Sequence, residues 1–221
     1  MRISNILVVI ALVASASPAA AATVLNFAPS GSSLILPVTK DYSSGGLTVT
    51  ASGFSAAHVT TALYGKNEGT GERGLGLAND PHGNPTEGEI SFGKGFVQID
   101  VSKLLGNVSS ISFLLNSVTQ GEQWSVFGSN TDGAYSGAAL FSGTSNSGAD
   151  LLSKSCLSKN ACSYYDFVST SQSGGQNFLL SGLTMNSAVP EPGTWMTMLL
   201  GFGLMGVGFR RRRPVQAFAA A

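Results

Sequence analysis

Hydrophobic and polar residues alternate along most of the chain between residues 24 and 183. The segments 47–50, 97–101 and 111–115 place every second side chain on one face, as a half-buried strand does. Trp124 and Val126 extend the same pattern. Only 102–105 favours a helical turn. Further candidate strands lie at 24–27, 34–38, 58–63, 89–92, 139–141, 165–168 and 178–183.

Turn-forming residues separate these candidate strands. Gly, Ser, Asn and Asp fill the intervals at 43–46, 130–133 and 173–175. Many short strands joined by such turns are typical of antiparallel all-β folds. We therefore predict an all-β domain, an antiparallel β-sandwich with a jelly-roll-like order of strands.

The N-terminus has the three parts of a secretory signal peptide. Arg2 supplies a positive charge, residues 6–13 form a short apolar run, and the small residues 19–22 follow. Signal peptidase accepts small residues at such positions, so we expect cleavage after Ala21 or Ala22. Residues 1–22 are predicted to be the signal peptide, and the rest of the chain to be exported.

The C-terminal segment combines a proline motif, an apolar run and a basic block. Pro190 and Pro192 hold the backbone extended on either side of Glu191. No charged residue occurs from Trp195 to Phe209. Read from Gly193 as a helix, the uncharged run reaches about 25 Å. Trp195 at one edge and snorkelling arginines at the other extend it toward a ~30 Å hydrocarbon core. Four arginines then fix the orientation by the positive-inside rule: Arg210, Arg211, Arg212 and Arg213.

This order of parts resembles the PEP-CTERM sorting signal, found at the end of surface proteins in bacteria that make exopolysaccharide. The resemblance rests on the motif Pro190, Glu191 and Pro192, on Trp195, on the apolar run and on the arginine block. It implies that a membrane protease-transpeptidase, exosortase, recognises the proline motif and removes the tail. The mature protein would then lie at the cell surface or outside the cell.

The two ends divide the chain into four predicted parts. Residues 1–22 are the signal peptide, and 23–188 form the extracytoplasmic β-sandwich domain. Residues 189–213 are the sorting signal with a single transmembrane helix at 194–209, and 214–221 are a cytoplasmic tail. Before processing, the domain would be anchored in the membrane and face the periplasm.

Charge within the predicted domain argues against a nucleic-acid partner. The whole chain has a formal net charge of zero. Residues 23–188 contain seven basic residues against 11 acidic ones, which leaves a net charge of −4. A mildly acidic domain without a basic patch lacks the electrostatic attraction that nucleic-acid binding requires.

The stretch from Asn67 to Glu89 is the least regular and the richest in polar ligands. Asp80, His82, Asn84, Glu87 and Glu89 fall within ten residues of one another. Oxygen ligands of this kind bind Ca²⁺, and the candidate calcium ligands are Asp80, Asn84, Glu87 and Glu89. The alternative is an ordinary solvated loop, because the spacing is not that of an EF-hand.

Catalytic motifs are mostly absent from the sequence. It contains neither G-x-S-x-G nor H-E-x-x-H, and its two histidines lie 24 residues apart. Glu87 and Glu89 would share a face of an extended segment, but the sequence gives no carboxyl separation. Trp124 either stacks on a sugar ring or packs in the core.

Cys156 and Cys162 are the only cysteines and enclose five residues. An exported protein meets an oxidising compartment, which favours a disulfide between them.

Two classes of function remain after these exclusions. The first is a non-enzymatic surface or matrix protein associated with exopolysaccharide or biofilm, with extracellular polysaccharide as a partner. The second is a surface-displayed hydrolase that acts on polysaccharide. The missing catalytic motifs favour the first.

Overall fold

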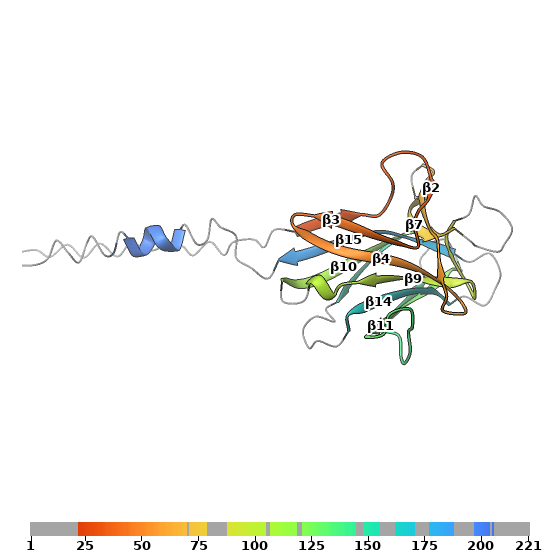
Figure 1. Ribbon diagram of the computed structural model, residues 1–221. Helices are drawn as coiled ribbons and strands as arrows, with labels where there is room; N and C mark the ends of the chain where they lie inside the picture. Colours follow the sequence, from red (N-terminus) through yellow and green to blue (C-terminus); the bar gives the residue numbers. More distant parts are fainter. Residues whose placement is uncertain are drawn as a thin grey trace, which may run out of the picture. The chain divides into compact units, whose positions relative to one another are not determined.

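In the computed structural model the chain divides into a β unit, Ala21–Val189, and a second unit made of Met1–Ala20 and Pro190–Ala221. The structure describes residues 22–69, 71–78, 88–104, 107–118, 121–144, 148–154, 162–170, 177–187, 197–203 and 205. Figure 1 shows the strands of the β unit and the short helix of the second unit.

The first sheet of the β unit has eight antiparallel strands. Their order is β13-β10-β15-β7-β6-β2, and β1 and β8 also pair with β15. The long strand β15 therefore has more partners than any other strand of this sheet. The strands are β1 (Ala22–Asn26), β2 (Leu34–Ile35), β6 (Leu63–Asn67), β7 (Arg73–Leu77), β8 (Ile90–Ser91), β10 (Val108–Val118), β13 (Gly148–Lys154) and β15 (Asn177–Ser187).

The second sheet has seven antiparallel strands, in the order β12-β11-β14-β9-β4-β3, with β5 paired to β4. In Figure 1 the labelled strands β4, β9, β14 and β11 follow one another across this sheet. A 3-10 turn, η1 (Ser102–Leu104), follows β9 where the sequence predicted a helical turn. The strands are β3 (Thr39–Ser44), β4 (Leu47–Ser55), β5 (Thr60–Thr61), β9 (Gly95–Asp100), β11 (Gln123–Ser129), β12 (Phe141–Thr144) and β14 (Tyr164–Ser169).

Side chains from both sheets meet in one core. Phe113 of β10 contacts the rings of Tyr165 and Phe167 of β14 edge-on, with 4.8 Å between centroids in each pair. All three residues are fully buried and belong to one apolar cluster. Alternating apolar positions on each strand supply this cluster because they all face the other sheet. The predicted all-β, antiparallel architecture is confirmed.

The stretch 67–89, the least regular one in the sequence, contains a strand that the sequence pattern did not predict. β7 alternates glycine with leucine, and Leu75 and Leu77 are buried in the core. The glycines face the other way, where backbone atoms leave no room for a side chain: a Cβ on Gly76 would overlap the carbonyl oxygen of Gly88. Strands β3, β6 and β13 were also not predicted as separate elements.

Helical residues of the second unit lie at 197–203 and at 205, inside the predicted transmembrane segment 194–209. The other residues of that segment lie outside the described part of the chain. Among the described residues, no helix is long and apolar enough to cross a membrane.

Candidate functional site

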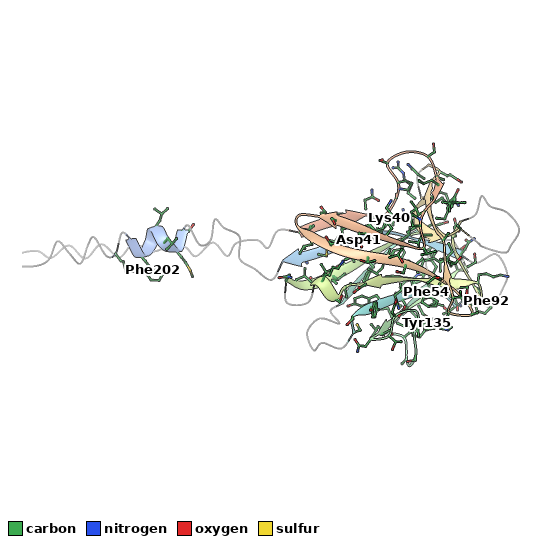
Figure 2. The ribbon with its side chains drawn as sticks, viewed as in Figure 1. Lys40, Asp41, Phe54, Phe92, Tyr135 and Phe202 are labelled. Atoms are coloured by element: carbon green, nitrogen blue, oxygen red, sulfur yellow. The ribbon has the colours of Figure 1, made fainter. Side chains whose placement is uncertain are left out.

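The described part of the C-terminal segment is an apolar helix with an uncovered surface. Its large apolar side chains are all exposed: Met198, Leu199, Leu200, Phe202 and Met205. Figure 2 labels Phe202 on this helix. The predicted motif residues Pro190, Glu191, Pro192 and Trp195, and the arginines Arg210 to Arg213, lie outside the described residues. Their roles stay predictions.

Within the β unit, a buried lysine binds two carboxylates. Lys66 of β6 donates to Oε1 of Glu89 and to Oε2 of Glu72, both at 2.6 Å from Nζ. Glu89 precedes β8 and is 3% exposed, whereas the side chain of Glu72, which precedes β7, is 38% exposed. Ser117 of β10 places its hydroxyl 2.9 Å from Glu72 Oε1 and 3.0 Å from Glu89 Oε1. We call these four residues the Lys66 cluster.

Backbone irregularities position the Lys66 cluster. The pairing of β10 with β13 shifts register between Asn116 and Val118, and Ser117 has a positive φ of 60° at this bulge. Its amide donates to the carbonyl of Gly71 at 2.9 Å, which ties the bulge to the residue before Glu72. The missing side chain of Gly76 lets the backbone of Gly88 and Glu89 lie against β7.

The two carboxyl groups of the cluster have pKa values shifted in opposite directions. Burial, helped by the contact with Glu72, raises the pKa of Glu89 to about 7 despite the opposing effect of Lys66. Burial would also raise the pKa of Glu72, but hydrogen bonds with Lys66, Glu89 and Ser117 hold it below its usual value. Burial would lower the pKa of Lys66, but both carboxylates together raise it. A proton shared by the two carboxyls therefore resides on Glu89.

Of the four predicted calcium ligands, only Glu89 lies within the described residues. Glu89 is engaged by the ammonium of Lys66, which occupies the place beside Oε1 that a cation would take. Asp80, Asn84 and Glu87, like His82, lie outside the described residues. Among the residues that the structure does describe, no group of three acidic, His or Cys side chains is arranged to hold a metal. The calcium site stays a prediction.

A second buried polar cluster lies on the face of the seven-stranded sheet away from the core. Asp166 of β14 is fully buried and accepts a hydrogen bond from Nε2 of its cross-strand partner Gln98 at 2.7 Å. The loop after β11 covers the pair: the amide of Gly133 donates to Gln98 Oε1 at 3.1 Å, and the carbonyl of Gly133 lies 2.8 Å from Nδ1 of His58. Here loop and sheet are joined by polar contacts.

Aromatic rings surround this second cluster. Tyr135 lies 5.0 Å from Phe96, 4.8 Å from Phe127 and 5.7 Å from His58 between ring centroids. Phe54 stacks on Phe96 at 5.1 Å. Figure 2 labels Phe54 and Tyr135 on this side of the β unit. Phe127 is the cross-strand partner of Asp166, so these rings lie on the same face of the sheet as the buried carboxyl.

Trp124 packs in the shared core and is 4% exposed, so of the two interpretations the structure favours packing over sugar stacking. Cys162, just before β14, is buried and disulfide-bonded. Its predicted partner Cys156 lies outside the described residues, and the pairing stays a prediction.

Sequence reasoning missed most of both clusters. It identified Glu89, but as a calcium ligand and not as a partner of Lys66. It singled out none of Lys66, Glu72, Ser117 or Asp166. Alternation identifies Asp166 as facing away from the core, between Tyr165 and Phe167. Nothing in the local sequence says that a loop covers that face.

Comparison with known proteins identifies one family motif in the chain. No curated protein and no solved structure matches it. Residues 188–213 match the PEP-CTERM protein-sorting motif, and this segment contains the proline motif, the apolar helix and the arginine block. That motif marks exported surface proteins that are targeted by exosortase. The chain therefore carries a PEP-CTERM protein-sorting motif at residues 188–213, and this motif implies exosortase as its processing partner.

Proposed function

We propose that the protein is a non-enzymatic surface protein associated with exopolysaccharide or biofilm. After signal peptidase acts, the segment 194–209 holds the β unit at the periplasmic face as a transmembrane helix. Exosortase then processes the tail at the proline motif, and the β unit reaches the cell surface or the medium. The match of residues 188–213 to the sorting motif carries this proposal.

In this proposal the β unit is the part of the protein that is displayed at the cell surface. Two antiparallel sheets contribute to one core, which supports a β-sandwich, and a jelly-roll-like strand order is part of the proposal. Such a domain presents loops and sheet faces without needing a catalytic centre.

The Lys66 cluster favours the non-enzymatic function over the polysaccharide hydrolase. Glycoside hydrolysis needs two carboxyl groups about 5 Å or more apart, with the sugar between them. Glu72 and Glu89 instead bind the same ammonium, and Glu89 is 3% exposed. The space between these carboxyls is filled by the protein itself.

A double substitution in the sorting motif tests the proposal. Pro190→Ala combined with Glu191→Ala should leave the chain membrane-bound and unshortened in a host that has exosortase. Immunoblots of membrane, surface and medium fractions, with an antibody against the β unit, give the location and size of the protein. The wild type should lose its C-terminal tail in the same host and keep the tail in a host without exosortase.

Thr194→Ala is the matched control because it changes the same tail outside the proline motif. It should be processed like the wild type. Identical processing of the double variant and the wild type would reject exosortase recognition at Pro190 and Glu191.

The association with polysaccharide is tested separately, by co-sedimentation of the processed protein with exopolysaccharide isolated from the host. Failure to sediment would reject that part alone.

A further inference from the structure

The Lys66 cluster contains the groups needed to form an amide bond. Nζ of Lys66 lies 2.6 Å from Oε1 of Glu89, and the same nitrogen lies 2.6 Å from Oε2 of Glu72. A nucleophile, a carboxyl group and a second carboxylate that can accept a proton are thus in mutual contact. Lys66 and Glu89 come from different segments, β6 and the residues before β8, so a bond between them would join two parts of the fold.

We propose that Lys66 and Glu89 condense into an intramolecular isopeptide bond, with Glu72 as the proton-accepting catalytic residue. Carboxylate Glu72 takes one proton from the Lys66 ammonium, and the resulting amine attacks Cδ of protonated Glu89. The Nζ–Cδ bond forms, and the bond from Cδ to the hydroxyl oxygen of Glu89 breaks. That oxygen leaves as water with its own proton and one from nitrogen. Glu72 ends protonated, and no oxidant, reductant or other reactant is required.

Ser117 positions the group that is attacked. Its hydroxyl lies within hydrogen-bond distance of Glu89 Oε1, where negative charge develops as nitrogen adds to Cδ. The bulge of β10, with Ser117 at φ 60°, aims that hydroxyl into the cluster. Non-glycine residues rarely adopt a positive φ, and such positions are often functional.

Burial favours the condensation in two ways. The fold holds amine and carboxyl together, which raises their effective concentration far above that of free reactants. The product also replaces a buried ammonium and carboxyl by a neutral amide, and buried charges are costly to desolvate. The partly exposed side chain of Glu72 shows that the cluster reaches solvent on one side, where the released water can leave.

The protonation states match these roles. The pKa of Glu89 is raised to about 7 by burial first and then by Glu72, so this carboxyl is the protonated one and hence the electrophile. Burial would raise the pKa of Glu72, but hydrogen bonds with Lys66, Glu89 and Ser117 outweigh burial and lower it, so this carboxyl is ionised and can take the proton. The lowered pKa of Glu72 and the raised pKa of Lys66 oppose the transfer, so the condensation is slow. The reaction occurs once in each molecule and does not depend on how the chain is sorted.

Peptide mapping of the full-length exported protein tests the proposal. Trypsin cuts after Lys40, Lys66, Arg73 and Lys94, but an acylated Lys66 is not cut. The wild type should yield residues 41–73 joined to residues 74–94, lighter by one water than the two peptides together. Fragmentation of the joined peptide should place the link at Glu89. Because Gly88 lies between Glu87 and Glu89, the fragment ions distinguish a link at Glu89 from one at Glu87. Separate peptides 41–66 and 74–94 from the wild type would overturn the proposal.

Glu72→Gln keeps the size of the side chain but removes the proton acceptor. This variant should retain the β signal in circular dichroism and lose the joined peptide. Glu68→Gln is the matched control, an exposed glutamate of the same β6–β7 connection that bonds to Ser33, and it should keep the link. A link that persists in Glu72→Gln would overturn the role given to Glu72. If Glu72→Gln does not fold, the wild-type map still decides whether the bond exists.

Discussion

Asp166 is a buried residue whose carboxyl group accepts a hydrogen bond from the described part of the chain at only one of its two oxygens. Its Oδ1 accepts a hydrogen bond from Gln98, while Oδ2 has no partner among the described residues. Burial raises the pKa of Asp166 from 3.8 to about 7; the Gln98 hydrogen bond opposes this rise, and the negative charge of Asp132 adds to it. The folded state therefore binds this proton more tightly than the unfolded chain does. As a result, the contribution of Asp166 to stability is greatest at low pH and is lost as pH rises from about 4 to about 7.

Asp166→Asn should stabilise the protein in alkaline solution. Asn keeps the acceptor for Gln98 but cannot ionise, so the variant avoids a penalty of up to about 4 kcal/mol at pH 8.5. The gain in melting temperature over the wild type should shrink as the pH is lowered to 5. Asp41→Asn, the same change at an exposed side chain labelled in Figure 2, should differ little from the wild type at either pH. An Asp166→Asn effect that is the same at both pH values would contradict the titration argument.

At the scale of elements, β7 shows how glycine builds the Lys66 cluster. Leu75 and Leu77 fill the core, and the opposite face of the strand must be bare because the backbone of Gly88 and Glu89 lies on it. A Cβ on Gly76 would overlap the carbonyl oxygen of Gly88 and approach Cα of Glu89 at 2.7 Å. The obstacle is backbone, which cannot rotate away as a side chain can.

Gly76→Ala should therefore lower the free energy of unfolding by about 1–3 kcal/mol, the usual penalty for overpacking. It should also move Glu89 from Lys66 and reduce formation of the proposed amide. Urea denaturation measures the first effect and peptide mapping the second. Gly31→Ala is the control, because a Cβ there meets nothing within 4 Å and the backbone needs no positive φ. Equal stability of the two variants would show that the packing argument is wrong.

The elements that the sequence predicted are those whose apolar side chains alternate. The segments 97–101, 111–115 and 165–168 largely coincide with β9, β10 and β14, because each points an apolar side chain into the core at every second position. β7 was not predicted because glycine occupies its alternate positions, so the pattern resembles a loop. The Lys66 cluster could not be predicted because contacts such as Glu72 to Ser117 join residues 45 positions apart. Its members carry no shared motif, and only the fold brings them together.

At the scale of the whole β unit, its first strand and its last strand are neighbours. β1 pairs with β15 in antiparallel register, with Ala22 opposite Asn186. Ala22, at the predicted signal-peptide boundary, therefore lies opposite a residue that precedes the start of the sorting motif by two positions in the sequence. Cleavage after Ala21 would leave β1 whole, and cleavage after Ala22 would remove only its first residue. Processing at either end thus leaves nearly all of the paired strands intact.

A chain that stops after Ala188 should accordingly be exported, released and folded. It retains β15, whose Phe178, Leu183 and Met185 are buried in the core and which pairs with β1, β7, β8 and β10. Its melting temperature should lie within a few degrees of that of the β unit processed from the wild type, because no core residue is lost. A chain that stops after Gln176 lacks β15 and should fail to fold, seen as loss of the cooperative thermal transition. If the chain ending at Ala188 also lacked that transition, the tail would be part of the folded unit, and the division at Val189 would be wrong.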